Sequence, residues 1–190
     1  MNAHPGSLAP AYIEFAAQSN FSFLRGASRP EELIVAARLL GHAAMGLADR
    51  NTVAGVVRAW SQSKAIRLTK DSEPIVLPYH PGARLVFSDG APDILAYPRD
   101  RAGWGKLCRM LTAANMRGEK GAPDLRFRDF WRWADHMSLA LLPDLSRPPS
   151  LEWLRRLKER FPGALRLAVA ADYRGDDRFR FRQAADLAAA

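Results

Sequence analysis

The chain has 190 residues, of which 48% are hydrophobic and 25% are charged. These proportions are those of globular proteins, so they exclude disordered, collagen-like and coiled-coil chains, and the length predicts a single domain. The one cysteine, Cys108, excludes an internal disulfide, and the sequence shows neither a signal peptide nor an apolar run of roughly 18 residues. We therefore expect a cytoplasmic protein that does not enter a membrane.

The positive charge lies mainly in the second half of the chain. The net charge is +8, and residues 99–190 hold 19 basic and 12 acidic side chains, against 9 and 8 in residues 1–98. Only five of the 28 basic residues are lysine, and the planar guanidinium of arginine suits phosphate recognition. A GC-rich genome also encodes arginine-rich chains, so the charge alone leaves a polyanion partner such as DNA open.

The first elements in chain order are a strand and a helix. Residues 12–18 form an apolar run that is typical of a strand. A capping box of Ser28 and Glu31, with Pro30 in the first turn, predicts the start of a helix. One face of this helix is apolar and is expected to pack on a sheet: Leu33, Ala36, Ala37 and Leu40.

A second strand and a second helix follow. Residues 43–48 predict a short buried strand that ends at Asp49, and a helical spacing of apolar residues predicts a helix (Val53, Val56, Val57 and Trp60). Catalytic groups are commonly found where such a strand ends, so Asp49 is a candidate functional residue. The alternative is that Asp49 or Asn51 caps the helix.

The region near residues 74–97 has a different pattern. Short extended runs at 75–77, 83–87 and 94–97 are separated by turn-forming residues, including Pro81-Gly82. This pattern predicts a small region of antiparallel hairpins.

A helix with an apolar face is predicted after the hairpins, from Trp104, Leu107, Cys108 and Leu111. We expect Cys108 to be a small buried hydrophobe and not a nucleophile, because no histidine lies near it in the sequence.

The tract at residues 115–128 is polar, contains glycine and is basic, which predicts an exposed loop. Its cations are candidates for contacts with nucleic-acid phosphates: Arg117, Lys120, Arg126 and Arg128. A short aromatic helix is predicted at residues 127–133, where Trp131 or Trp133 could stack on bases. The alternative, which we favour, is that this helix packs through its aromatic face.

The remaining sequence alternates strands and helices. Strands are predicted at 137–142 and 165–170, and helices at 151–161 and from Asp176 or Asp177 to Ala189. Such alternation is typical of an α/β fold with a largely parallel sheet. The apolar face of the last helix needs a sheet to cover it, and no strand follows (Phe181, Ala184, Ala185 and Ala188). We therefore expect a barrel-like fold that is incomplete at its carboxyl end.

Four stretches of the sequence carry a family resemblance. They are SNFSFLRGAS followed by PEEL at residues 19–33, GLADRNTVAGVVRA at 46–59, the segment from YP to GEKG at 97–121 and, more weakly, YRGDD at 173–177. Together they resemble the amino-terminal PHP (polymerase and histidinol phosphatase) domain of bacterial error-prone DNA polymerases. These enzymes are C-family relatives of the DNA polymerase III alpha subunit.

The resemblance implies a fold and an organisation for the chain. We expect a disordered tail at residues 1–11, and at 12–190 a truncated PHP domain with the distorted β/α barrel of that family. The parent enzymes are nucleotidyltransferases of damage-induced translesion synthesis in DNA replication and repair. Their polymerase active site would lie beyond residue 190, so the remaining polymerase domains, mutasome-type accessory proteins or DNA are the expected partners.

The resemblance also implies a degenerate metal site. Metal-dependent PHP domains hydrolyse phosphate esters, and the positions of their site correspond here to Glu14, Ala16, Gln18, Asp49 and Arg50. A His-x-His pair is replaced by Ala16 and Gln18, and neither a methyl group nor a neutral amide can replace an imidazole ligand. A fixed guanidinium charge at Arg50 opposes a nearby cation. We therefore expect no metal, no other cofactor and no catalytic residue in this chain.

Three functions follow from these observations. The favoured one is a non-catalytic structural or interaction module of an error-prone polymerase. The others are a residual metal-dependent phosphoesterase of the PHP superfamily and a free-standing basic DNA-binding domain.

Overall fold

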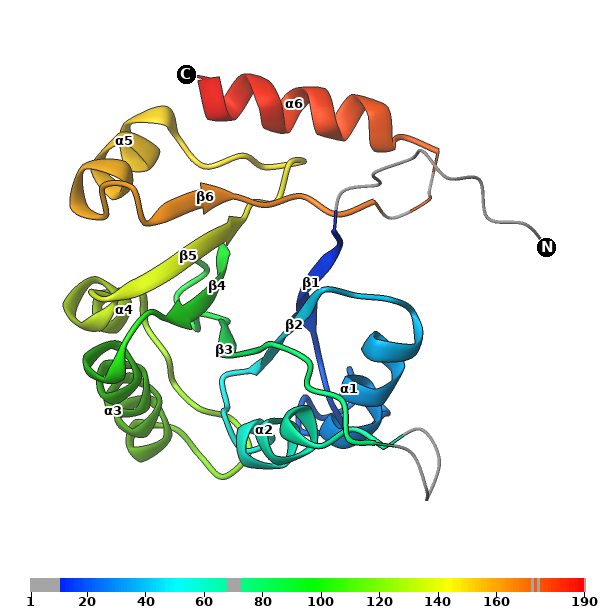
Figure 1. The fold of residues 1–190 in the computed structure, drawn as a ribbon. Coiled ribbons are helices and arrows are strands. Elements are labelled where there is room, and N and C mark those ends of the chain that lie inside the picture. Colours follow the sequence, from blue (N-terminus) through cyan, green and yellow to red (C-terminus); the bar gives the residue numbers. More distant parts are fainter. Residues whose placement is uncertain (1–10, 68–72, 172, 174, 190) are drawn as a thin grey trace. The chain divides into compact units, whose positions relative to one another are not determined.

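The computed structural model describes residues 11–67, 73–171, 173 and 175–189. The tail predicted for residues 1–11 therefore lies outside the described residues, apart from Ala11. The chain forms two compact units, of which unit 1 contains the described residues up to 47 and from 54 to 80, and unit 2 contains 48–53 and the described residues from 81 onwards. The hydrogen-bonded strand order is β1-β2-β3-β4-β5-β6 (Figure 1). Strands β2 (Ala44–Arg50) and β3 (Tyr79–Leu85) each continue from one unit into the other.

Unit 1 is built from strand β1 (Ile13–Ala17), the start of β2 and two helices, α1 (Pro30–Leu39) and α2 (Val56–Lys64). Strands β1 and β2 are parallel, as predicted for an α/β fold. The helices bury their small and apolar residues against β2 in a core of Ile34, Ala37, Met45, Leu47, Ala59, Ile66 and Leu77. The unit therefore has a hydrophobic core of its own.

The capping box of α1 lies one residue later than predicted. The carboxylate of Glu32 accepts a hydrogen bond of 2.8 Å from the backbone N–H of Arg29, so the Ser28–Glu31 pairing is wrong. Pro30 is the first helical residue, and a proline keeps the residue before it extended, which places Arg29 outside the helix.

Helix α2 turns a different face to the core from the one predicted. Val57 and Trp60 are exposed, whereas Ala59 and Ser63 are buried. The residue that precedes α2 is Gly55, with no side-chain cap, so the prediction that Asp49 or Asn51 caps this helix is wrong. The apolar spacing was helical, but the small residues form the packed face because they let α1 and α2 approach closely.

The strands of unit 2 form a mixed arrangement. Strand β4 (Asp93–Pro98) pairs antiparallel with β3 and with β5 (Met137–Leu142), whereas β6 (Leu165–Leu167) pairs parallel with β5. The predicted antiparallel hairpin region is confirmed. The prediction of a largely parallel sheet is wrong for unit 2, because β4 returns along β3 and β5 returns along β4.

Pro81 and Gly82 lie inside β3 and do not form the predicted turn. A Cβ atom on Gly82 would stand 2.5 Å from the ring of Tyr97 on β4. Only a residue without a side chain leaves room for this ring, so Gly82 is a packing glycine.

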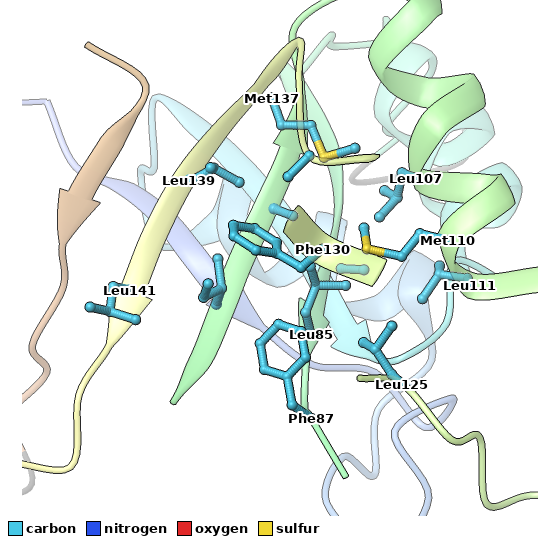
Figure 2. Close-up of a cluster of buried hydrophobic side chains, with 14 of the residues drawn as sticks. Leu85, Phe87, Leu107, Met110, Leu111, Leu125, Phe130, Met137, Leu139 and Leu141 are labelled. Carbon is cyan, nitrogen blue, oxygen red and sulfur yellow. The ribbon is translucent and has the colours of Figure 1, made fainter. Parts of the chain in front are cut away.

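The core of unit 2 lies between its strands and three helices, α3 (Arg101–Arg117), α4 (Phe127–Trp133) and α5 (Leu151–Arg160). Figure 2 shows Leu107, Met110 and Leu111 of α3 directed towards strand residues such as Leu139, with Phe130 of α4 among them. Elements α4 and β5 have the predicted bounds, and α5 ends one residue before its predicted end.

The last helix, α6 (Asp177–Ala189), begins after Asp176, as predicted. Ala184 is its one buried residue, while Phe181 is 41% exposed. The preceding strand β6 is shorter than predicted, because pairing with β5 ends at Leu167. Among the described residues, no helix has both the length and the apolar composition that a membrane crossing requires.

Gly103 and Gly105 in α3 provide a matched test of the packing of unit 2. A Cβ on Gly103 would stand 2.3 Å from the backbone oxygen of His136, whereas a Cβ on Gly105 meets nothing within 4 Å. We expect Gly103→Ala to lower the free energy of unfolding by about 1–3 kcal/mol through overpacking. Gly105→Ala should raise it by up to about 1 kcal/mol through helix propensity. Urea unfolding measures both, and equal effects of the two changes would contradict the close contact.

Candidate functional site

Three of the predicted site positions lie in unit 1. Glu14 and Ala16 are on β1, and Gln18 follows this strand directly. The carboxylate of Glu14 accepts hydrogen bonds from the hydroxyl of Tyr12, at 2.8 Å, and from the backbone N–H of Ala16. Glu14 is thus used in local bonding within its own strand.

The other two predicted positions, Asp49 and Arg50, lie in unit 2 at the carboxyl end of β2. Asp49 is only 1% exposed, whereas Arg50 is exposed. This location is the one predicted for Asp49, but its burial could not be read from the sequence.

The donor chemistry of these five positions does not fit a transition-metal cluster. Ala16 has no lone pair to offer, Gln18 offers only a neutral oxygen, and Arg50 cannot lose its proton. Within residues 11–67, 73–171, 173 and 175–189, no group of three or more His, Cys, Asp or Glu side chains is arranged to hold a metal ion. The metal chemistry that the family resemblance implies therefore has no donor set among the described residues.

Asn51 holds the end of β2 and was considered only as a helix cap in the sequence. Its side-chain amide donates to the backbone oxygen of Val86 and accepts from the backbone N–H of Val86, both at 2.8 Å. The backbone N–H of Asn51 donates to the oxygen of Arg84 at 2.9 Å. Asn51 has a positive φ of 50° and is 7% exposed. The side-chain amide of Asn51 thus makes the hydrogen bonds to Val86 that a backbone residue of β2 would make if the strand continued.

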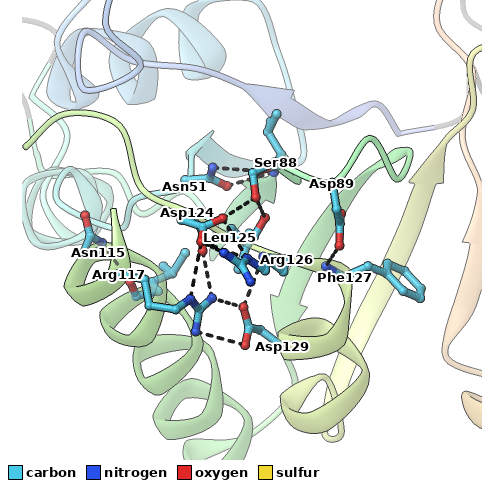
Figure 3. Close-up of polar contacts among 12 residues, drawn as sticks. Asn51, Ser88, Asp89, Asn115, Arg117, Asp124, Leu125, Arg126, Phe127 and Asp129 are labelled. Atoms are coloured by element: carbon cyan, nitrogen blue, oxygen red, sulfur yellow. Dashed lines mark hydrogen bonds and ion pairs between the residues drawn. The ribbon is translucent and has the colours of Figure 1, made fainter. Parts of the chain in front are cut away.

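The predicted basic loop is tied down by ion pairs, which Figure 3 shows. Arg126 binds both carboxylate oxygens of Asp124, with the shortest distance at 2.6 Å. Arg117, the last residue of α3, forms a close pair with Asp129 and donates to the backbone oxygen of Asp124 at 2.8 Å. Leu125 between them is completely buried. The segment is therefore not the freely exposed loop that its composition predicted.

The cations of this segment thus fall into two groups. Arg117 and Arg126 each have a carboxylate partner, whereas Lys120 and Arg128 are exposed and have no ion pair with any described residue. The carboxylates offset the positive charge that these two arginines would present to a phosphate. Contacts of these four cations with nucleic acid remain a prediction.

Asp124 is the centre of this network. The Arg126 guanidinium, helped by the hydroxyl of Ser88, lowers the pKa of the Asp124 carboxyl from 3.8 to about 2. Ser88 also binds the backbone of Leu125 through its own N–H, at 2.7 Å. The hydroxyl of Ser88 and the guanidinium groups of Arg126 and Arg117 thus keep Asp124 ionised over the pH range in which most proteins are folded.

The tryptophans of α4 pack against aromatic neighbours, as we favoured from the sequence. The ring of Trp131 lies 6.2 Å from that of Phe127 and 6.1 Å from that of Phe161, between ring centroids. Trp133 packs against the core of unit 2. This packing accounts for both residues without a nucleic-acid base.

Cys108 and His136 show no sign of a reactive site. Burial raises the pKa of the Cys108 thiol, which disfavours the nucleophilic thiolate. The Nδ1 atom of His136 lies 2.7 Å from a carboxylate oxygen of Asp100, and the other oxygen of that carboxylate accepts from the backbone N–H of Gly103 at the start of α3. The pair thus positions a helix end.

Comparisons with known proteins show which proteins are similar to this chain. An error-prone DNA polymerase of Mesorhizobium japonicum is 62% identical over 181 residues, which cover 93% of this chain. An error-prone DNA polymerase of Sinorhizobium medicae is 45% identical over 94% of the chain. This chain is homologous to an amino-terminal segment of error-prone DNA polymerases. It spans only 15% of the length of either relative, and no family model matches it.

Solved structures support the fold of the chain. A protein of Bifidobacterium adolescentis described as a metal-dependent phosphoesterase superposes with a TM-score of 0.65 at 18% identity, covering 94% of this chain and 85% of its own. An amidohydrolase of Chromobacterium violaceum gives 0.58 at 17% identity, covering 93% and 83%. At such identities the likeness concerns the fold alone, and it agrees with the α/β class that the sequence predicted.

The Asn51 amide should be important for the stability of the chain. Asn51→Ala removes both bonds to Val86 and should lower the free energy of unfolding by about 1–3 kcal/mol. Asn51→Gly loses the same bonds but adopts positive φ freely, so it should cost about 1 kcal/mol less. Urea unfolding of the three proteins measures this order, and a glycine variant no more stable than the alanine variant would argue against the strained backbone.

The stabilising effect of Asp124 should disappear in acid. Its pKa is lower in the folded chain than the ordinary 3.8, so its contribution is complete above about pH 4 and is lost as the pH falls towards 2. Asp124→Asn should therefore have a lower urea midpoint than the wild type at about pH 6, and this difference should become much smaller as the pH falls to about 2. Glu159→Gln, at an exposed position of α5, controls for the loss of one negative charge. A difference that persists unchanged in acid would contradict the role of the Asp124 charge.

Proposed function

We propose that this chain is a non-catalytic structural or interaction module of an error-prone DNA polymerase that carries out damage-induced translesion synthesis in DNA replication and repair. The observation that carries the proposal is the donor set at the predicted metal positions, where Ala16, Gln18 and Arg50 cannot serve as metal ligands. The polymerase relatives support the parent function.

The packing of the segment is consistent with a supporting role. Its polar side chains are largely engaged in holding the backbone, as with Asn51 on Val86 and Arg126 on Asp124. Such groups stabilise a surface and leave it rigid, which suits a module that other domains contact. The partners we propose are the remaining polymerase domains or mutasome-type accessory proteins, in the cytoplasm.

The two alternative functions have less support. A residual phosphoesterase would need metal ligands that the donor set lacks, although the fold resembles that of a protein described as a metal-dependent phosphoesterase. A free-standing DNA-binding domain would rely mainly on Lys120 and Arg128, because Arg117 and Arg126 already bind carboxylates.

Metal analysis of the full chain tests the proposal. The chain, purified without chelator, should hold far less than one zinc or manganese ion per molecule, and it should not hydrolyse bis-p-nitrophenyl phosphate when these metals are added. The variant Ala16→His/Gln18→His tests the substitution itself, because its two added imidazoles should make it bind zinc more tightly than the wild type does. Stoichiometric metal in the wild type, with hydrolysis that EDTA abolishes, would instead establish the phosphoesterase.

A further inference from the structure

Unit 2 contains an apolar hollow between α5, β6 and α6. Its volume is about 260 Å³, and leucines from all three elements line it, including Leu154, Leu165 and Leu187. Leu151, also on its wall, is 42% exposed. Partly exposed leucine side chains around a concave surface favour the binding of an apolar group.

The hollow continues along α6. A second hollow of about 330 Å³ shares Leu151 and Leu187 with the first, extends to Pro148 and Gln183, and includes one acidic residue, Asp186. Together the two hollows form a furrow along α6. The furrow exists because α6 packs loosely, with Ala184 as its one buried residue. An elongated furrow with a deeper apolar part fits a stretch of polypeptide that inserts one or two large side chains.

The size of the deeper part argues for a protein occupant. Pockets for small ligands commonly measure about 300–1,000 Å³ and enclose most of the ligand. The first hollow is smaller than this, and the second, at about 330 Å³, lies at the lower end of the range and is open, so each matches one or two side chains better than a whole metabolite. The backbone of a protein segment would lie in the rest of the furrow.

Three cations define the chemistry of the occupant. Arg155 and Lys158 of α5 and Arg166 of β6 line the same hollow, and all three are exposed. The guanidinium of Arg166 is held by the backbone oxygens of Gly163 and Leu165, at 3.0 and 2.9 Å. An apolar floor beside a positive edge is complementary to leucine or phenylalanine flanked by aspartate and glutamate.

We propose that the furrow between α5, β6 and α6 is a docking site for an acidic segment of a separate partner protein, which anchors a large apolar side chain among the leucines. The inference deepens the interaction role proposed above. It rests on that role only for its biological setting. The metal analysis tests the non-catalytic role and peptide binding tests the furrow, so either proposal can fail without the other.

Fluorescence anisotropy with the full chain and labelled peptides tests this site. The peptide DEDELLEDED should bind, whereas its neutral counterpart SQSQLLQSQS and its apolar-deficient counterpart DEDESSEDED should each bind about tenfold more weakly or worse. Binding of the first peptide should weaken as salt is added, since exposed charges are screened. Equal binding of the three peptides would overturn the proposal.

Matched variants locate the binding. Arg155→Glu/Lys158→Glu should weaken binding of DEDELLEDED by about tenfold or more, and Leu151→Gln should also weaken it. Arg101→Glu/Arg109→Glu makes the same charge change at exposed positions of α3 and should alter binding less than about twofold. Thermal melts confirm that each variant is folded. An equal loss in both double variants would show general attraction to the basic chain and overturn the site.

The other occupants are distinguished by the same proteins. Self-association in sedimentation that Arg155→Glu/Lys158→Glu abolishes would show that a second copy covers the furrow. Binding of DEDELLEDED only above about millimolar concentration would be too weak for a separate partner, which no linker holds at the furrow. Either result would overturn the proposal of a separate partner.

Discussion

The fit of the Tyr97 ring over Gly82 is the constraint on which the sheet of unit 2 depends. Residues Ile94, Leu95, Ala96 and Tyr97 are all buried, so β4 lacks the alternation of polar and apolar residues that normally selects one register. A shift by one residue would keep apolar groups on both faces, but it would move the ring from the only position that Gly82 opens. Packing shape, and not hydrophobicity, therefore selects the pairing of β3 with β4.

In this register, the side chains of β4 pack into two hydrophobic clusters, one on each face of the strand. Ile94 and Ala96 join the large cluster with α3 and α4, while Leu95 and Tyr97 join Ala48 on the other face. The ion pair of Arg84 with Asp93, at 2.7 Å, closes the same strand pair at its end. The helices then pack on strands whose side chains already point in fixed directions.

The sequence predicted the elements whose signals are local. The aromatic run at residues 127–133 and the apolar run at 137–142 have bounds that match α4 and β5, because each is set off by polar neighbours. Pro81-Gly82 was predicted as a turn because nothing nearby reveals the Tyr97 ring, which comes from another strand. For the same reason the buried face of α2 was misjudged, since small residues such as Ala59 are chosen by the neighbouring helix.

In the candidate site too, properties of a single side chain were predicted, whereas contacts between residues far apart in the sequence were not. The unsuitability of Ala16 and Arg50 as metal ligands follows from side-chain chemistry, so the sequence was sufficient. The pairing of Arg117 with Asp129 and the bonds of Asn51 to Val86 join residues 12 and 35 positions apart, and no spacing rule predicts them. The charges along residues 115–128 therefore did not reveal the ion pairs of Arg117 and Arg126.

The division of the chain into two units has a spectroscopic consequence. Four of the five tryptophans belong to unit 2, and Trp131 and Trp153 both adjoin the ring of Phe127 in its core. Unit 1 has only Trp60, which is 53% exposed and whose ring lies beside the ammonium of Lys64. Intrinsic fluorescence would thus report almost entirely on unit 2, and a loosening of unit 1 alone would pass nearly unseen. Only a probe of backbone structure, such as circular dichroism or amide exchange, would reveal whether the two units melt together.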